Sequence, residues 1–557
     1  MLVGRAMNSK NQNNFINHNI GSEVKTFPIP LSLEEIKDDT EFTNSELSKE
    51  KAIEKASKLH LQGSIIEAEK YYRFAIKKGC NDPFVFSNYG TLLKRIGKSN
   101  EAKSFFKKAI KSQPDFAEAH NNLGNLLKDC GEFQEAEKCF LNALKFKYHF
   151  AEAHNNLGNV LSELDRIKEA EKSFRCSIKI NPKYYKPHLN LGVILLNFGL
   201  LEEAELSLCN AINLNKNLAK AYFYLSILQL PEKARSWEHK LFSESLLISQ
   251  TDKDKIDIYF ARANILNKNK NYYESAKYLK LANNLKLKLF PSKPNDFIKE
   301  SKSLILETDQ NDIKNLTDSK FAENIFIVGM PRSGSTLLES IISMNSNVID
   351  LGEVNYFEES YKKWKALKKT NSEVTLSELY SNKINPTNDL FRITTNKWLY
   401  NYQYVGIISS EIPNSKIIHC FRNPLDNILS LYRANFFKGN QYSSSLTDCA
   451  NLYINHEETM DIYKKKYRSN IYDLNYDLLV SNPQEEIISL ISWLGWEWDD
   501  SYLSPHLNTR PVSTASKVQV RSPINSKSLG GWKNYRDMLK PAIEILRDTK
   551  RYENLTY

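Results

Sequence analysis

The sequence of 557 residues predicts two folds in series: an α-solenoid, followed by an α/β domain with a parallel sheet. Two observations carry this prediction. Small residues recur every 34 positions through the first half of the chain, which is the period of a two-helix repeat. In the second half, short apolar runs alternate with helical segments, as strands joined by helices do.

Four series of residues carry the 34-residue period. They are Gly90, Gly124, Gly158 and Gly192; Ala68, Ala102, Ala136, Ala170 and Ala204; Gly63, Gly97, Gly131 and Gly199, with Asp165 in the gap; and Tyr72, Phe106, Phe140 and Phe174. Helices that cross closely need small side chains at the crossing and an aromatic ring beside them. The pattern is that of the tetratricopeptide repeat, whose arrays form curved solenoids with a concave binding face.

The pattern also predicts where the repeats begin. Five clear repeats start near Lys49, Pro83, Ala117, Ala151 and Tyr185. A sixth repeat, degraded by Pro231, is expected near Ala219. A weaker seventh unit has Ala263, Ser275 and Ala282 at matching offsets.

A ladder of asparagines recurs two residues before each glycine of the first series. Its members are Asn88, Asn122, Asn156 and Asn190. On the first helix of each pair they are expected to face the groove, where amides could bond an extended peptide. The ladder resembles the asparagine ladder of the O-GlcNAc transferase repeat array. The alternative is that asparagine is simply common at this position.

Composition excludes several classes. The net charge of +10 is not concentrated in one block, so no nucleic-acid partner is predicted. No apolar run is long enough for a transmembrane segment, and residues 1–19 lack a signal-peptide core. Seven cysteines without a C-x-x-C pair indicate reduced thiols and a cytoplasmic protein. The histidines His120, His154 and His188 follow the repeat period, so no metal site is predicted.

These observations divide the chain into four segments. Residues 1–48 are expected to be a disordered polar tail, 49–285 the solenoid, 286–322 a connector and 323–557 the α/β domain. Predicted strands of the last segment are Ile325–Val328, Lys416–Phe421 and Asn470–Leu474. Predicted helices are Ser335–Met344 and Pro424–Phe436.

The first predicted strand runs into a loop with the glycine spacing of a nucleotide P-loop. Gly329 and Gly334 have that spacing, but Ser335 stands where the lysine should be, and Arg332 lies inside the loop. Backbone N–H groups from Arg332 to Thr336 can wrap an anion at the start of the next helix. This combination indicates a loop that holds a phosphate without metal-assisted phosphoryl transfer. The alternative is an ordinary strand-to-helix turn.

A second segment, residues 416–432, repeats this arrangement. A buried strand delivers Arg422 at its end, Pro424 begins a helix, and Ser430 lies about two turns into it. The expected second anion site faces the first. Two such sites suit a nucleotide with phosphates at both its 5′ and 3′ positions.

These segments resemble the sulfotransferase superfamily, whose donor is 3′-phosphoadenosine 5′-phosphosulfate (PAPS). The resemblance is strongest to tyrosylprotein sulfotransferases and to bacterial proteins that fuse tetratricopeptide repeats to such a domain, and it covers residues 323–557. It implies that Arg332, Ser333, Gly334, Ser335 and Thr336 bind the 5′-phosphosulfate and that Arg422 and Ser430 bind the 3′-phosphate. It implies further nucleotide contacts from Tyr476 and from a late closing loop with Ser516, Gln519, Val520 and Arg521.

The same resemblance implies catalytic roles for Glu353, Lys397 and Arg332. Glu353 would take the proton of the acceptor hydroxyl, and Lys397 would contact the leaving oxygen. The other candidate base, His419, lies in an apolar strand and is expected to be structural. Two positions depart from the tyrosylprotein enzymes: Gly531 replaces a lysine, and Ala434 replaces an arginine.

The sequence therefore predicts a PAPS-dependent sulfotransferase with a peptide or protein acceptor in the repeat groove, a protein tyrosine in particular. A carbohydrate hydroxyl is an alternative acceptor, since the loops do not encode the acceptor. A repeat adaptor with a non-catalytic nucleotide-binding domain is an alternative from another class. A P-loop kinase is the third, and the missing lysine argues against it.

Overall fold

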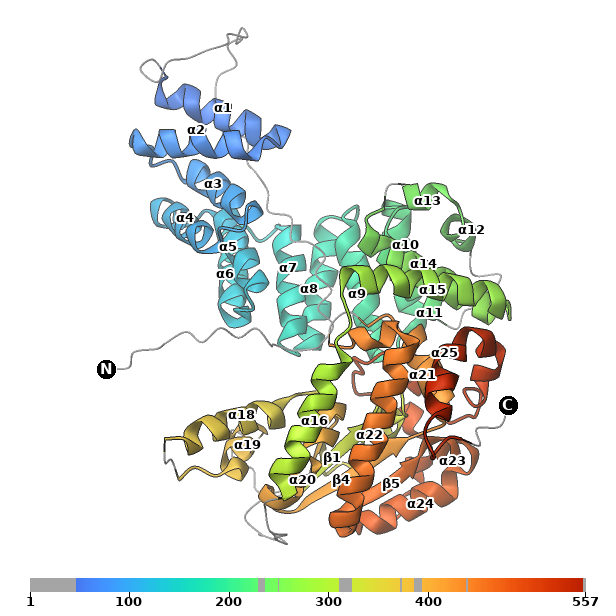
Figure 1. Cartoon of the computed structure of the whole chain (residues 1–557). Coiled ribbons are helices and arrows are strands. Elements are labelled where there is room, and N and C mark those ends of the chain that lie inside the picture. Colours follow the sequence, from blue (N-terminus) through green and yellow to red (C-terminus); the bar gives the residue numbers. More distant parts are fainter. Residues whose placement is uncertain are drawn as a thin grey trace. The chain divides into compact units, whose positions relative to one another are not determined.

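The computed structural model describes residues 47–228, 236–248, 250–309, 323–370, 373–384, 393–436 and 439–553. Residues 1–46 of the predicted tail, Pro231, and residues 310–322 of the predicted connector lie outside them. The described chain divides into two compact units. One contains the residues up to 195 together with 206–216, and the other contains 196–205 together with the residues from 217 onward. Figure 1 shows both units and labels most of their helices and some of their strands.

Ten helices follow the five clear repeats. They are α1 (Lys49–Gln62), α2 (Ile65–Lys77), α3 (Pro83–Arg95), α4 (Ser99–Ser112), α5 (Ala117–Asp129), α6 (Phe133–Phe146), α7 (Ala151–Glu163), α8 (Ile167–Ile180), α9 (Tyr185–Phe198) and α10 (Leu201–Leu214). The first helix of each pair begins at the residue where the sequence predicts a repeat to start. The predicted α-solenoid of tetratricopeptide repeats is confirmed.

Close helix crossings explain why the period carries glycine and phenylalanine. A Cβ added to Gly90 would lie 2.8 Å from the ring of Phe106, and one added to Gly158 would lie 2.6 Å from the ring of Phe174. Both rings are buried. A methyl group at the crossing would therefore displace an aromatic ring that fills the interior of the repeat.

The asparagine ladder joins successive repeats. Nδ2 of Asn156 donates to Oδ1 of Asn121 (2.9 Å), and Nδ2 of Asn190 donates to Oδ1 of Asn155 (3.0 Å). Nδ2 of Asn122 likewise donates to Oγ of Ser87, and all four ladder residues, including Asn88, are buried. The ladder lies on the predicted helices, but three of its amides bind neighbouring helices. Its peptide-binding role stays a prediction.

The other unit contains the remaining helices and a five-stranded sheet. The helices are α11 (Ala219–Ile227), α12 (Glu238–Leu241), α13 (Ser245–Ile248), α14 (Asp252–Lys268), α15 (Tyr272–Leu289), α16 (Pro294–Asp309), α17 (Ser335–Ile342), α18 (Tyr356–Lys368), α19 (Leu376–Ile384), α20 (Val405–Glu411), α21 (Pro424–Arg433), α22 (Leu446–Lys466), α23 (Tyr476–Ser481), α24 (Pro483–Leu494) and α25 (Arg536–Arg547). The strands are β1 (Asn324–Gly329), β2 (Val348–Asp350), β3 (Ile393–Asn396), β4 (Ser415–Phe421) and β5 (Ile471–Asn475).

The sheet has the order β2-β3-β1-β4-β5, and all its neighbours are parallel. This confirms the predicted α/β domain. In the longest register, Asn324 pairs with Ser415 and Gly329 with Cys420, so β1 and β4 end side by side. Both predicted anion-binding segments follow these two strand ends, where ligands bind in open α/β sheets.

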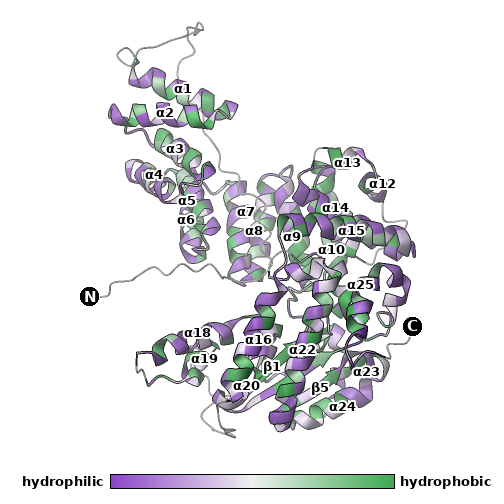
Figure 2. Cartoon of the chain, viewed as in Figure 1, coloured by the Kyte–Doolittle hydropathy of each residue, from purple (hydrophilic) through white to green (hydrophobic). Residues whose placement is uncertain are grey.

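Helices cover both faces of the sheet. Every residue of the central strand β1 is therefore buried. Phe326 and Val328 belong to a large hydrophobic cluster on one face, together with residues of α20, α22 and α25. Ile325 and Ile327 belong to a second cluster on the other face, together with residues of α17 and α24. Figure 1 shows α16, α20 and α22 crossing the strands, and Figure 2 shows the hydrophobic residues along β1.

Helices α14 and α15 share the larger of these two clusters. Phe260 and Leu279 pack in the same hydrophobic cluster as Phe326. Polar contacts support the packing: Oγ of Ser275 lies 2.9 Å from the hydroxyl of Tyr535, and Asn283 donates to the carbonyl of Tyr432 (2.9 Å). The helix pair that shows the weak seventh repeat pattern is therefore built into the unit that contains the sheet.

Within the described part of the chain, no helix combines the length and the apolar character that crossing a membrane requires.

The crossing at Gly158 supplies a stability test. We expect Gly158→Ala to lower the unfolding free energy by about 1–3 kcal/mol, because the new methyl group displaces the Phe174 ring. Far-UV circular dichroism during urea unfolding measures the loss. Lys172→Ala, an exposed change on the following helix, is the control and should stay within about 0.5 kcal/mol of the wild type. Equal stabilities for Gly158→Ala and the wild type would contradict this account of the repeat.

Candidate active site

Two glycines allow the loop after β1 to approach its neighbours closely. Gly334 has φ of +96°, and a Cβ there would lie 2.2 Å from Cδ2 of Tyr476. Gly329 has φ of +147°, and a Cβ there would lie 2.3 Å from the carbonyl oxygen of Cys420 on β4. Both positions combine a backbone conformation that favours glycine with a lack of space for a side chain. The loop is thus held against β4 and against the start of α23.

Arg332 joins three segments of the predicted site. Its Nε donates to Oγ of Ser430 (3.0 Å), its NH1 donates to Oγ of Ser516 (2.5 Å), and its NH2 donates to Oε1 of Gln519 (2.9 Å). The residue itself has φ of +70°, which is uncommon for a side chain of this kind. Arg332 is therefore in direct contact with three residues that the sequence places in two other, distant motifs.

Arg422 lies beside this group, directly after β4. Its NH2 donates to the carbonyl of Ser528 (3.1 Å), its NH1 approaches the carbonyl of Arg332 (3.4 Å), and its guanidinium lies 4.6 Å from the centre of the Tyr476 ring. Burial and the charge of Arg422 lower the pKa of Arg332 to about 10. Two positive charges therefore lie close together. Arg422 forms ion pairs with Asp426 (4.0 Å) and Asp477 (3.9 Å), whereas no carboxylate of the described chain forms one with Arg332, whose charge a bound anion would neutralise.

Two polar atoms at this place are buried without a hydrogen bond. They are Oγ of Ser333 and Nε of Arg422, and neither has a hydrogen-bond partner within the described ranges, although Nε of Arg422 lies 3.9 Å from Oδ1 of Asp477 in an ion pair. A buried donor without an acceptor is costly, and ligand sites are among the places where such atoms occur. Both belong to the residues expected to bind the phosphates of PAPS, and both can donate to phosphate or sulfonate oxygens. The residues present thus fit this anionic donor.

A second group contains the two other predicted catalytic residues. Oε1 of Glu353 lies 3.5 Å from Nζ of Lys397, and Nζ of Lys397 lies 2.7 Å from Oε2 of Glu339. Burial raises the pKa of Glu353, against the charge of Lys397. For Lys397 burial acts in the opposite direction, but Glu339 and Glu353 together raise its pKa. A carboxylate able to accept a proton therefore stands beside a lysine that stays charged.

The sheet and α17 position this pair. Lys397 follows β3 directly, and its backbone N–H donates to the carbonyl of Gly352 (2.9 Å), next to Glu353. Glu339 lies on α17, the helix that begins at the anion loop. Arg510 pairs with Glu339 (3.3 Å) and also contacts Asp350 at the end of β2. The carboxylate, the lysine and the anion loop are thus linked through α17.

The two departures from the family pattern have different surroundings. A Cβ at Gly531 would lie 3.8 Å from Oδ1 of Asp426, an ordinary contact, so the fold does not demand glycine there. Asp426 instead accepts from the backbone N–H groups of Gly530 (2.7 Å) and Trp532 (3.0 Å). Ala434 ends α21. The preceding Arg433 lies over the ring of Tyr535, with 5.8 Å to the ring centre.

The other predicted nucleotide contacts are arranged as follows. Oγ1 of Thr336 lies 3.2 Å from Oγ1 of Thr514, and Ser335 is buried at the start of α17. Val520 is buried, and Arg521 donates to backbone carbonyls, including that of Arg510 (2.6 Å). Arg521 therefore holds its own loop, and it is not joined to Arg332. The binding roles of these residues stay predictions.

The sequence did not point to Glu339, Arg510, Asp426 or Asn427. Asn427 is buried and donates to the carbonyl of Pro331 (3.1 Å), which fixes the anion loop on α21. A signal was present for Glu339, because it is a lone carboxylate within the apolar run of α17. Arg510 lies 171 residues farther along the chain, and no local pattern relates the two.

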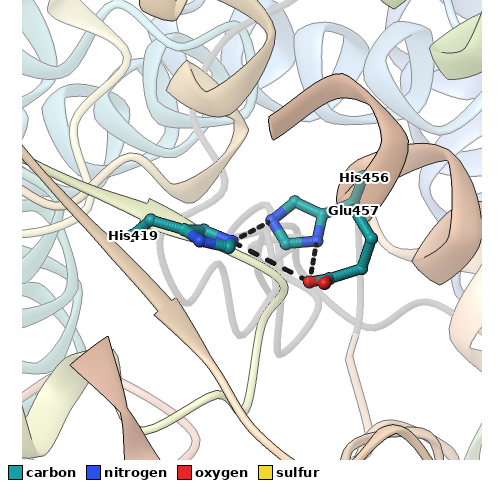
Figure 3. A group of neighbouring side chains, drawn as sticks. All are labelled: His419, His456 and Glu457. Carbon is teal, nitrogen blue, oxygen red and sulfur yellow. Dashed lines mark hydrogen bonds and ion pairs between the residues drawn. The ribbon is translucent and has the colours of Figure 1, made fainter. Parts of the chain in front are cut away.

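A buried group of histidines lies elsewhere in this unit (Figure 3). His419 on β4 and His456 on α22 face each other, with 3.2 Å between their Nε2 atoms, and Glu457 lies beside them. Potential ligand atoms of the three lie within 4.8 Å of one another, close enough to hold a metal ion. Asp473 contacts Nδ1 of His419 (3.1 Å), and Arg551 pairs with Glu457 (2.9 Å). Protein groups therefore supply charged partners already, and the expectation of no metal stays a prediction.

Both parts of the chain match known protein families. Residues 324–500 match the Sulfotransferase family, and residues 85–116, 117–147 and 151–184 match tetratricopeptide repeats. An uncharacterized protein of Aquifex aeolicus (strain VF5) is 31% identical over 244 residues, which are 40% of this chain and 32% of that protein. A Caenorhabditis briggsae protein named "Putative protein-tyrosine sulfotransferase" is 26% identical over 238 residues, which are 38% of this chain and 82% of that protein.

Solved structures with similarity to this chain include repeat proteins. A crystal structure of MamA is 24% identical with a TM-score of 0.27, and it covers 30% of this chain and 96% of MamA. A tetratricopeptide repeat protein from Parabacteroides merdae ATCC 43184 is 19% identical with a TM-score of 0.32, and it covers 42% of this chain and 93% of that chain.

The histidine group predicts a pH dependence. Burial lowers the pKa of His419 to about 4, below its ordinary value of 6.5. The unfolded chain therefore binds the proton first as the pH falls, and stability is lost between pH 6.5 and 4. We expect His419→Gln to lose about 2 kcal/mol less unfolding free energy than the wild type over this range.

Tryptophan fluorescence during urea unfolding measures this difference, because all seven tryptophans lie in the unit that contains the sheet. His149→Gln, an exposed change in the other unit, is the control and should keep the pH profile of the wild type. A His419→Gln profile that follows the wild type at every pH would rule out the neutral buried His419.

Proposed function

We propose that this chain, which joins tetratricopeptide repeats to a domain of the sulfotransferase family, transfers a sulfonate group from PAPS to a hydroxyl acceptor, a protein tyrosine in particular. The observation that carries the proposal is the pairing of Glu353 with Lys397, joined through Glu339 to the helix of the anion loop. A base, a fixed cation and an anion site within one structure are what sulfonate transfer requires.

The donor would be held by residues from both strand ends. Arg332, Ser333 and the N–H groups at the start of α17 would bind the phosphosulfate, and Arg422 with Ser430 would bind the 3′-phosphate. Support comes from Ser333 Oγ and Arg422 Nε, which are buried without a hydrogen bond in the described chain, and from the positive charge of Arg332, which no ion pair in the described chain neutralises. When bound, PAPS supplies the electrophilic sulfur and a stable bisphosphate leaving group.

The acceptor would lose its proton to Glu353. The raised pKa of this carboxyl makes it a stronger base than an exposed glutamate, while the neighbouring Lys397 keeps a share of it ionised. Lys397 would in turn stabilise the negative charge that develops on the leaving oxygen. Glu339 holds the ammonium group of Lys397 in place, and the burial of Lys397 excludes water around that group.

The acceptor class is proposed from two observations. The Caenorhabditis briggsae relative carries a protein-tyrosine name, and tetratricopeptide repeats offer a protein-binding surface. Transfer from radiolabelled PAPS to tyrosine peptides, to the same peptides with phenylalanine in place of tyrosine, and to polysaccharides tests it. Label on the tyrosine peptides alone is expected. Label on the polysaccharides alone would overturn the tyrosine acceptor while leaving the donor chemistry in place.

Substitution of the base separates catalysis from binding. We expect Glu353→Gln to lower kcat by about 100-fold to 10,000-fold, because the acceptor keeps its proton, while donor affinity stays close to that of the wild type. Single-turnover transfer and calorimetric titration with 3′,5′-adenosine bisphosphate measure the two effects. Glu358→Gln, on the following helix, is the control and should leave kcat unchanged. An undiminished kcat in Glu353→Gln would remove Glu353 from the mechanism.

A further inference from the structure

The segment that closes on Arg332 is also held from its other side. We call residues 508–521 the donor-site loop, because its Ser516 and Gln519 bind the guanidinium of Arg332. The backbone N–H of Val512 donates to the carbonyl of Asn197 (2.8 Å), and NH2 of Arg521 donates to the same carbonyl (2.9 Å). Asn197 lies in the last turn of α9, within residues 196–205 of the same compact unit.

Lys517 adds a buried contact to this attachment. Its Nζ donates to Oδ1 of Asn197 (3.0 Å) and lies 5.1 Å from the ring centre of Tyr224 on α11. The residue is only 5% exposed, and no carboxylate of the described chain forms an ion pair with it. Burial lowers its pKa to about 7. A buried lysine held by one amide and one ring is sensitive to the position of both.

The turn between α9 and α10 differs from the equivalent turns of earlier repeats. Gly63, Gly97, Gly131 and Gly199 have φ values of +84°, +80°, +80° and +78° at the same repeat position. A Cβ at Gly199 would lie 2.6 Å from Nε of Arg521, whereas no atom lies within 4 Å of a Cβ at Gly63 or Gly97. The same backbone conformation is thus open at those two turns and covered by the donor-site loop at Gly199.

We propose that the turn Asn197–Gly199, together with Tyr224, positions the donor-site loop and thereby sets the affinity for the nucleotide donor. The contacts run in one chain: Asn197 holds Lys517, the adjacent Ser516 binds Arg332, and Arg332 shapes the anion loop. This inference rests on the proposed function, because it concerns the donor of that same site. By linkage, a donor that binds Arg332 stabilises the attachment at Asn197 by the same factor.

Two glycine variants of the full chain test the positioning role. Gly199→Ala and Gly97→Ala introduce the same backbone strain, but only the first places a methyl group against Arg521. We expect the affinity for 3′,5′-adenosine bisphosphate to fall about 10-fold in Gly199→Ala and to stay within about 2-fold of the wild type in Gly97→Ala. Equal affinities in both variants, with wild-type binding intact, would overturn the inference and leave the proposed function standing.

Hydrogen exchange of the Val512 amide gives a readout that needs no donor. Its protection should be lost in Gly199→Ala and kept in Gly97→Ala. If the wild type does not bind the bisphosphate, the proposed function fails, and exchange still decides whether the turn holds the loop.

Asn197→Ala removes only the side-chain oxygen that accepts the hydrogen bond of Lys517. It should raise KM for PAPS without changing kcat, and a fall in kcat alone would contradict a positioning role.

Discussion

The guanidinium of Arg332 is the interaction on which the site depends. It donates hydrogen bonds to the hydroxyl oxygens of Ser430 and Ser516 and to the amide oxygen of Gln519. No carboxylate of the described chain forms an ion pair with it. Its positive charge is therefore positioned but not neutralised. A left-handed residue at this point costs about 1 kcal/mol, and the three hydrogen bonds offset that cost. Removing Arg332 would break the link between the anion loop and the donor-site loop and would leave Asn427 to hold the anion loop on α21.

The parallel sheet brings the remaining chemistry to the same edge. β1 and β4 end side by side, which places the anion loop next to Arg422. Lys397 follows the end of β3, and the end of β2 leads to Glu353. The buried Glu339 on α17 then connects the two halves of the site, because the helix that starts at the anion loop also carries the partner of the lysine. The anion loop and the pair of Glu353 and Lys397 are thus joined by one helix.

Much of this arrangement could be predicted from the sequence, for physical reasons. The repeat helices begin at the predicted residues because helix crossings admit only small side chains, which leaves a strict period. Strands β1, β4 and β5 were predicted to within a residue or two at each end, since long buried strands are apolar runs. β2 and β3 were missed, because they have three and four residues and β3 reads Ile-Thr-Thr-Asn. The contact of Arg510 with Glu339, and the use of the asparagine amides between repeats, depend on tertiary packing that no local pattern encodes.

We propose that Arg332 and Arg422 form a metal-independent site for a nucleotide with phosphates at the 5′ and 3′ positions of its ribose. Calorimetric titration of the full chain with 3′,5′-adenosine bisphosphate and with ADP, each with and without magnesium, measures this preference. We expect tight binding of the bisphosphate in both conditions and weak binding of ADP. A preference for ADP that requires magnesium would rule out such a site.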